Sequence, residues 1–300
     1  MAREITQPKT KTLIPTISLK LHFFIGLALV AIFWTASWLH LGVLGEYAFF
    51  PLWLGYILTL DALVALRKGT SLLTDSPSHF ISLFLLSAPV WWLFEAANSF
   101  TLNWHYLGAE NYSRLQIILE EMVDFSIVVP AVFETTMLVL TFDFVRRFEH
   151  ASFRVHVSRN TLWFLMYLGA FMFLAIILFP AYAFPFIWVW LLLLIDPLNW
   201  MRGRPSLLEQ LSRGDFHLII ALPLATLVCG FFWEMWNFYS FPKWYYTVPY
   251  IMFAKIFEMP LIGYLGYIPF GWELYALYQF VWGALKLGEP HAFGMAAPEA

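Results

Sequence analysis

Residues 91–106, WWLFEAANSFTLNWHY, place a glutamate and an asparagine inside an otherwise aromatic and apolar segment. A second stretch, FFWEMWNFYSFPKWYY at 231–246, repeats this arrangement of acid, amide and aromatic residues. A helix puts residues three apart on one face, so the acid and the amide of each stretch are expected to lie side by side. The matched pairs are Glu95 and Glu234, Asn98 and Asn237, Trp104 and Trp244, and Tyr106 and Tyr246.

Further matches on both sides extend this pair into a tandem repeat. FPLWLGYILTLDALVALRKGTSLL, from Phe50, aligns with FPFIWVWLLLLIDPLNWMRGRPSLL, from Phe184, with one inserted residue. PAVFE at 130–134 matches PFGWE at 269–273, and in both units 39 residues separate the first glutamate from the second. We therefore predict two repeated units, at 21–150 and 151–284, with tails at 1–20 and 285–300.

The composition indicates a membrane protein, because 61% of the residues are hydrophobic and only 12% are charged, against about a quarter in soluble domains. Eight apolar runs approach the roughly 20 residues that cross a bilayer as a helix. We predict an all-α polytopic bundle of eight transmembrane helices, arranged as two tandem parallel four-helix repeats. The runs are 21–40, 48–66, 79–100, 125–145, 161–180, 184–201, 216–239 and 264–284.

The basic residues predict the orientation, because Lys and Arg in short loops stay on the cytoplasmic side. All but three of the 17 Lys and Arg residues, namely Arg114, Lys243 and Lys255, fall on the side of the two termini. We expect an integral protein of the bacterial inner (plasma) membrane with both termini in the cytoplasm. The chain has no basic run suited to nucleic acid, so no nucleic-acid partner is expected, and the sequence does not indicate an oligomeric state.

Four glutamates in the predicted spans are the candidate catalytic residues. A carboxylate near the bilayer centre costs roughly 2.5 to 3.5 kcal/mol, so these acids should face one another, water or a ligand. The topology places all four in the outer half, Asn98 and Asn237 are expected to orient the acids beside them, and a proline four residues earlier predicts a kink before two of them. The four are Glu95, Glu134, Glu234 and Glu273.

Aromatic residues near these acids are the candidate substrate-binding residues, because ring faces stabilise a nearby cation. Interfacial belts and core packing are equally good explanations for any single ring. We expect no metal and no cofactor, since the chain lacks the histidine and glycine patterns of such sites. The candidates are Trp92, Trp104, Tyr106, Trp233, Trp236, Trp244, Tyr246 and Trp272.

Three other residues in the apolar runs are expected to have structural roles. Asp61 and Asp196 each lie about two turns before an arginine, and we expect them to bond to that arginine or to loop backbone, although a second functional layer stays open. The single cysteine, Cys229, lies in an apolar run and is expected to be a small core residue.

The order of acid, tryptophan and a proline closely followed by an acid resembles the integral-membrane lycopene cyclases and, more loosely, the related carotenoid hydratases. Each unit carries this order, over about 45 residues: Glu95, Trp104, Pro130 and Glu134, and then Glu234, Trp244, Pro269 and Glu273. The chain departs from the family in having one acid, not two adjacent acids, after the proline. FEMP, with Glu258 and Pro260, offers a second register.

The resemblance implies a cofactor-independent reaction on a long isoprenoid or carotenoid lipid, begun by a proton from a carboxylic acid. Glu134 and Glu273 are then the expected donor or acceptor, with Glu95 and Glu234 as partners. Two other functions stay open. A proton- or cation-coupled transporter would use the same four glutamates, and a lipid-binding or assembly protein would need them for stability alone.

Overall fold

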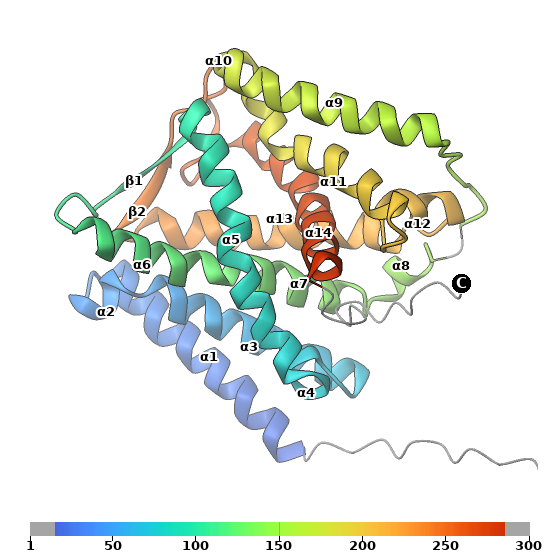
Figure 1. Cartoon of the computed structure of the whole chain (residues 1–300). Helices are drawn as coiled ribbons and strands as arrows, with labels where there is room; N and C mark the ends of the chain where they lie inside the picture. Colours follow the sequence, from blue (N-terminus) through green and yellow to red (C-terminus); the bar gives the residue numbers. More distant parts are fainter. Residues whose placement is uncertain (1–15, 150, 286–300) are drawn as a thin grey trace, which may run out of the picture.

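A computed structural model describes residues 16–149 and 151–285 and is mostly helical (Figure 1). Of the predicted tails, residues 1–15 and 286–300 lie outside the described residues. The α-helices are α1 (Thr16–Trp38), α2 (Val43–Glu46), α3 (Phe49–Lys68), α4 (Leu72–Asp75), α5 (Pro77–Thr101), α6 (Arg114–Asp124), α7 (Val128–Val139), α8 (Asp143–Arg146), α9 (Arg159–Leu178), α10 (Pro180–Ala183), α11 (Trp190–Met201), α12 (Leu207–Arg213), α13 (His217–Phe238) and α14 (Tyr267–Ala284). The 3₁₀ segments are η1 (Phe125–Ile127), η2 (Phe184–Trp188) and η3 (Leu261–Gly266), and the strands are β1 (Trp104–Leu107), β2 (Lys243–Tyr246), β3 (Lys255–Ile256) and β4 (Met259–Pro260).

Six helices in the described part of the chain are long and apolar enough to span a membrane, and a bent pair raises the number to seven. Eight were predicted, and the eighth, α14, is not among them. Most of α14 is buried, including Glu273 and Gln279, so protein rather than lipid surrounds it. The six are Leu21–Trp38, Phe49–Lys68, Pro77–Thr101, Arg114–Val139, Arg159–Leu178 and His217–Phe238.

The predicted span at 184–201 is broken rather than continuous. The segments Pro180–Trp188 and Trp190–Met201 meet at Val189 with a bend of 42°. The break turns Trp188 toward the aromatic core, where it stacks on Phe94 and Trp104 with 5.8 Å between ring centroids in both pairs. The matching helix, α3, runs unbroken from Phe49 to Lys68.

Close helix pairs form the two opposite edges of the bundle, α1 with α3 and α9 with α11 (Figure 1). Gly26 and Gly55 let the first pair approach, because a Cβ on Gly55 would lie 2.7 Å from the Gly26 carbonyl oxygen. Gly169 does the same for the second pair, where a Cβ would lie 2.8 Å from the Trp190 oxygen. Small residues at such crossings allow the close packing typical of membrane helices. Helices α7, α13 and α14 pack between these edges.

Two short antiparallel ribbons modify the all-α prediction. β1 pairs with β2 in the register Trp104 with Tyr246 through Leu107 with Lys243, and β3 pairs with β4. Each strand of the first ribbon lies at the end of one of the two repeated sequence stretches, so the ribbon links segments that are far apart in the chain (Figure 1). We call the end of the bundle that carries β1 and β2 the ribbon end.

Asp61 and Asp196 hold the loops that follow their helices, at the opposite end from the ribbon. Asp61 accepts hydrogen bonds from the Ser71 hydroxyl at 2.7 Å and the Leu73 N–H at 3.0 Å. Asp196 accepts them from the Ser206 hydroxyl at 2.9 Å and the N–H groups of the two residues that follow. The prediction of loop-backbone bonding is confirmed, and neither aspartate has a described bond to an arginine; Asp61 also lies 3.1 Å from the His22 ring of α1.

Candidate functional site

A cavity of about 1510 Å³ opens at the ribbon end of the bundle. Its wall combines side chains of α3, α5, α6, α13, α14, the broken segment before α11, and both strands of the first ribbon. Ligand pockets usually measure about 300 to 1,000 Å³, so this cavity can take a long molecule. Six of the eight predicted substrate-binding residues line it: Trp104, Tyr106, Trp233, Trp236, Trp244 and Tyr246.

The other two predicted binding residues lie elsewhere. Trp92 is 40% exposed on the outer side of α5. Trp272 donates to the Ile219 carbonyl at 3.0 Å and borders a small apolar pocket of about 160 Å³ beside α9 and α11. Neither lines the large cavity, because successive helix positions point about 100° apart, and proximity in sequence to Glu95 or Glu273 does not give a shared direction.

Glu95 is the one predicted catalytic glutamate that lines the cavity. Its Oε1 atom accepts three hydrogen bonds: from Trp91 Nε1 at 2.9 Å, Trp104 Nε1 at 2.9 Å and the Tyr106 hydroxyl at 2.5 Å. These fix the carboxyl group through one oxygen, and Oε2 has no described hydrogen bond. Tyr106 is 45% exposed, but desolvation of its hydroxyl in the cavity wall, and then the neighbouring Glu95, raise its pKa above the ordinary value, so the phenol remains a donor.

Glu234 lies behind the cavity wall rather than on it. It is fully buried, and its Oε1 accepts hydrogen bonds from the hydroxyls of Tyr246 at 2.7 Å and Tyr267 at 2.9 Å. Both tyrosines line the cavity. Burial and then Glu234 raise the pKa of Tyr246 well above its ordinary value. Trp244 Nε1 donates to the Tyr246 hydroxyl at 2.9 Å, whereas its counterpart Trp104 donates directly to Glu95.

Closely packed aromatic rings from both halves of the chain form the inner wall, and those around Phe270 meet it edge to face. Phe270 lies at the centre, with ring centroids 5.3 Å from Phe94, 5.7 Å from Trp188 and 5.9 Å from Trp91. Trp233 stacks on Tyr267 at 6.1 Å. Trp188, Tyr267 and Phe270 were not among the predicted site residues. Phe270 stands within the matched PFGWE segment, and the break that directs Trp188 inward has no counterpart in α3.

The two asparagines do not hold the glutamates, contrary to the prediction. Asn98 donates to the Trp104 carbonyl at 2.9 Å and accepts from the Asn103 N–H at 2.8 Å. Asn237 binds the carbonyl and the N–H of Trp244, at 2.8 and 2.9 Å. Both lie in the last turn of a helix, where carbonyls lack partners and the chain leaves toward a strand. They therefore position the strand, and through it the indole and phenol groups.

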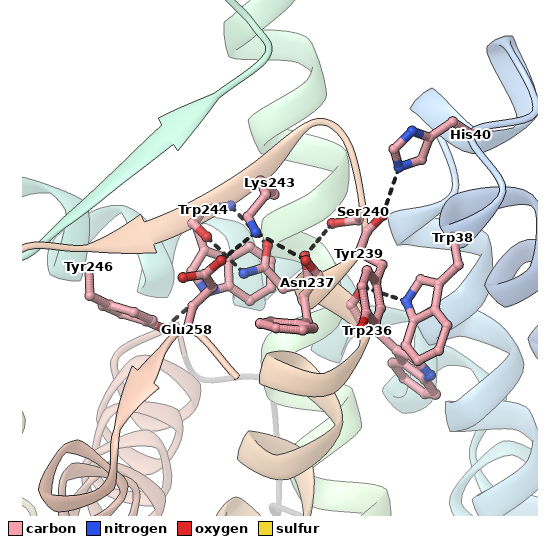
Figure 2. A network of polar contacts seen from close by, with 11 residues as sticks. Trp38, His40, Trp236, Asn237, Tyr239, Ser240, Lys243, Trp244, Tyr246 and Glu258 are labelled. Carbon is pink, nitrogen blue, oxygen red and sulfur yellow. Dashed lines mark hydrogen bonds and ion pairs between the residues drawn. The ribbon is translucent and has the colours of Figure 1, made fainter. Parts of the chain in front are cut away.

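A polar network ties the second strand to its surroundings (Figure 2). The Lys243 ammonium donates to the Phe238 carbonyl at 3.0 Å and pairs with Glu258 of the FEMP segment. Trp38 Nε1 donates to the Trp236 carbonyl at 3.2 Å, and the His40 ring bonds the Tyr239 carbonyl at 2.8 Å. The network joins the end of α1 to the end of α13, which fixes one side of the cavity.

Glu134 and Glu273 do not line the cavity, and no hydrogen bond or ion pair joins any two of the four glutamates in the described chain. Glu273 accepts the N–H of Leu191 at 3.1 Å, in the first turn after the break. Glu134 is fully buried, without a hydrogen-bond partner at either oxygen. The predicted proline kinks also differ: Pro130 and Pro269 both stand in the first turn of a helix, α7 and α14, where no N–H is needed.

Acidic residues of α6 line the cavity and were not predicted as site residues. Glu120, Glu121 and Asp124 stand on the cavity wall, while Met122 of the same helix is exposed and does not line the cavity. This helix is amphipathic, and in a membrane bundle the polar side of such a helix indicates a water-filled or ligand-filled space inside. The pattern of charges at 120, 121 and 124 was the signal available from sequence.

In comparisons with known proteins, no family model, no curated protein and no solved structure matches the chain.

Proposed function

We propose that this chain is an integral membrane enzyme that moves a proton between a carboxyl group and a hydrophobic, isoprenoid- or carotenoid-like lipid, as a cyclase, isomerase or hydratase does. The observation that carries the proposal is the setting of Glu95. One carboxyl oxygen is fixed by three donors, and the other has no described bond, on the wall of a large aromatic cavity.

The chemistry follows from these groups. A proton leaves the Glu95 carboxyl and bonds to one carbon of an alkene, using the π electron pair, so a cation forms on the neighbouring carbon. The faces of Trp91, Trp188 and Phe270 stabilise that cation. Loss of a C–H proton to the Glu95 carboxylate restores the double bond and gives an isomer. Addition of water to the cation, with transfer of one water proton to the Glu95 carboxylate, gives a hydrate. Neither the isomerisation nor the hydration requires a cofactor.

The roles differ from those that the resemblance implies. Glu95 replaces Glu134 and Glu273 as donor and acceptor, because neither of those lines the cavity. Glu234 acts as a positioning residue through Tyr246 and Tyr267.

The finer architecture is part of the proposal: eight transmembrane segments, with α14 crossing inside the protein, form two tandem four-helix repeats. Matched contacts support it, namely the loop bonds of Asp61 and Asp196, the strand bonds of Asn98 and Asn237, and the pairing of β1 with β2. We also propose cytoplasmic termini in a bacterial inner membrane, on the distribution of Lys and Arg.

Proton- or cation-coupled transport is the second candidate, and one observation favours it. Six carboxylates line the cavity, whereas Lys243, already paired with Glu258, is the one lysine or arginine among the described lining residues. Such a surface attracts cations. The six are Glu46, Glu95, Glu110, Glu120, Glu121 and Asp124.

Lipid mass spectrometry tests the enzyme proposal. Cells that make linear carotenoid precursors receive the wild-type chain, Glu95→Gln, or Glu209→Gln, whose glutamate pairs with Arg213 on α12 outside the cavity. We expect a product that is isomeric with its precursor, or heavier by one water, from the wild type and Glu209→Gln, and none from Glu95→Gln. An unchanged lipid profile with well-folded wild-type protein contradicts the enzyme, and Glu95-dependent proton uptake in proteoliposomes then supports the transporter.

A further inference from the structure

Glu134 stands apart from the cavity, in the middle of the protein. It belongs to α7, has no exposed surface, and neither of its carboxyl oxygens has a hydrogen-bond partner. An ionised carboxylate without such partners is very unfavourable in an apolar interior, so the group takes a proton and becomes neutral. The protonated, neutral form of Glu134 is therefore the one that this setting favours.

Its counterpart Glu273 is stabilised in another way. Because the span before α11 is broken at Val189, the first turn of α11 has free N–H groups, and Glu273 accepts that of Leu191 at 3.1 Å. Helix α3 has no break, so it offers Glu134 no free N–H. At this matched position, Glu273 in the second half therefore caps a helix, whereas Glu134 in the first half has no hydrogen-bond partner.

Two titratable groups connect Glu134 to the end of the bundle opposite the ribbon. Helix α3 packs against α7, and its Asp61 is the carboxyl group close enough to Glu134 to influence it. Asp61 is fully buried, and its Oδ2 lies 3.1 Å from Nε2 of His22 on α1. His22 Nε2 has no other hydrogen-bond partner, and its side chain is 16% exposed. His22 is the member of this set with exposed surface, and it lies one residue from the start of the span Leu21–Trp38.

The second half lacks this connection. Asp196 makes the same loop bonds as Asp61, but Leu165 of α9 borders the small apolar pocket beside it, where α1 presents His22 to Asp61. A leucine cannot carry a proton. The first half alone therefore combines an unpartnered acid, a second acid and a histidine.

The other groups around Glu134 do not complete a metal site. The elements packed against α7 contribute Lys68 from α3, Cys229 from α13, which contacts the neighbouring Thr135 at 3.3 Å, and His79 from α5, which bonds to Tyr278. In the described residues, no three His, Cys, Asp or Glu side chains are grouped to hold a metal ion. The ligand that fits this set is a proton.

We propose that His22, Asp61 and Glu134 form a proton-binding site, separate from the cavity, in which Glu134 carries the proton and exchanges it with solvent through Asp61 and His22. On release, the O–H bond of Glu134 breaks as one forms on Asp61, and the proton then passes from Asp61 to His22 Nε2. Uptake follows the reverse order.

Infrared spectroscopy of the full chain in lipid nanodiscs tests the site without any lipid substrate, so its result is independent of the proposed enzyme activity. We expect a protonated-carboxyl carbonyl band at neutral pH that moves when the glutamates carry carbon-13, and that is lost in Glu134→Gln. After transfer to D₂O, His22→Leu should slow the O–H to O–D shift of this band by about 100-fold, since a positioned proton relay contributes roughly that much.

His40→Leu is the matched control, because His40 lies just beyond the other end of α1 and bonds the Tyr239 carbonyl. It should exchange at the wild-type rate. A band that persists unchanged in Glu134→Gln, or equal exchange rates in His22→Leu and wild type, overturns the proposal. If Glu134→Gln does not fold, the labelled wild-type protein decides: absence of any protonated-glutamate band at neutral pH overturns it as well.

Discussion

At the scale of single residues, the Tyr106 hydroxyl makes the shortest of the three hydrogen bonds to Glu95, at 2.5 Å. Tyr106→Phe removes this donor and leaves the ring in place. Hydrogen bonds to charged groups contribute about 1.5 to 3 kcal/mol, so we expect product formation to fall by roughly 10- to 100-fold. The measurement is the initial rate in isolated membranes.

Tyr245→Phe is the control for this substitution. Tyr245 belongs to β2 and does not line the cavity. Its ring stacks on that of His105, with 5.2 Å between the ring centroids. It should keep the wild-type rate. Equal rates in Tyr106→Phe and Tyr245→Phe would show that the Tyr106 hydrogen bond contributes nothing to turnover.

The raised pKa values of Tyr106 and Tyr246 predict a pH dependence of stability. In the unfolded chain tyrosines lose their protons at about pH 10, while these two keep theirs when folded. The unfolded state then binds fewer protons, so the free energy of unfolding should fall as pH rises above about 10. Thermal unfolding from pH 8 to 11 should show a smaller decline for Tyr246→Phe than for wild type; parallel curves would contradict this.

Single residues also show which side-chain contacts could be predicted from the sequence and which could not. The loop bonds of Asp61 and Asp196 were predictable because their partners, Ser71 and Ser206, lie only ten residues away. The hydrogen-bond partners of Glu134 and Glu273 could not be predicted, because they depend on whether the neighbouring helix, α3 or α11, begins at a break. Asn98 and Asn237 were wrongly predicted to orient the glutamates. Spacing by three residues within a helix does not take account of the unpaired backbone groups at a helix end, or of the strand that follows it.

At the scale of helices, the contact of α1 with α3 depends on Gly26. A Cβ there would lie 2.8 Å from the Gly55 carbonyl oxygen, which cannot move aside as a side chain can. Gly26→Leu should therefore separate the helices and lower the free energy of unfolding by about 3 kcal/mol, the upper part of the range for overpacking. The measurement is the thermal unfolding midpoint in detergent.

Ala28→Leu provides the comparison on the same helix, because Ala28 is exposed. It should unfold at the wild-type temperature. If both variants unfold at that temperature, the glycine contact is not needed for packing of the pair.

Helix positions were predicted well where one apolar run makes one straight helix, as for the segments at 48–66 and 216–239. They failed where tertiary packing decides. The break at Val189 follows from seating Trp188 among Phe94, Trp104 and Phe270, and α14 is less apolar than a lipid-facing span because protein surrounds it.

At the scale of the whole molecule, the ribbon of β1 and β2 joins the two halves. His105 and Tyr245 face each other in its register, and opposed residues of antiparallel strands lie at a Cα separation that a disulfide can bridge. His105→Cys with Tyr245→Cys should therefore cross-link under oxidation. A protease site placed between residues 151 and 158 makes this visible, since the cut halves stay joined on a non-reducing gel.

His105→Cys with Trp244→Cys is the control pair, because neighbouring strand residues point to opposite faces. It should separate into two fragments under the same conditions. Separation of the first pair as well would show that the halves do not meet through this ribbon.

The one cysteine of the chain also gives the protein a built-in reporter. Cys229 of α13 is fully buried, with its sulfur 3.3 Å from the Thr135 hydroxyl of α7 and 3.9 Å from that of Tyr56 on α3. It is thus sealed between a helix of the second half and two helices of the first. A thiol reagent can reach it only when those helices part, so the alkylation rate of the unmodified chain measures how often the two halves open.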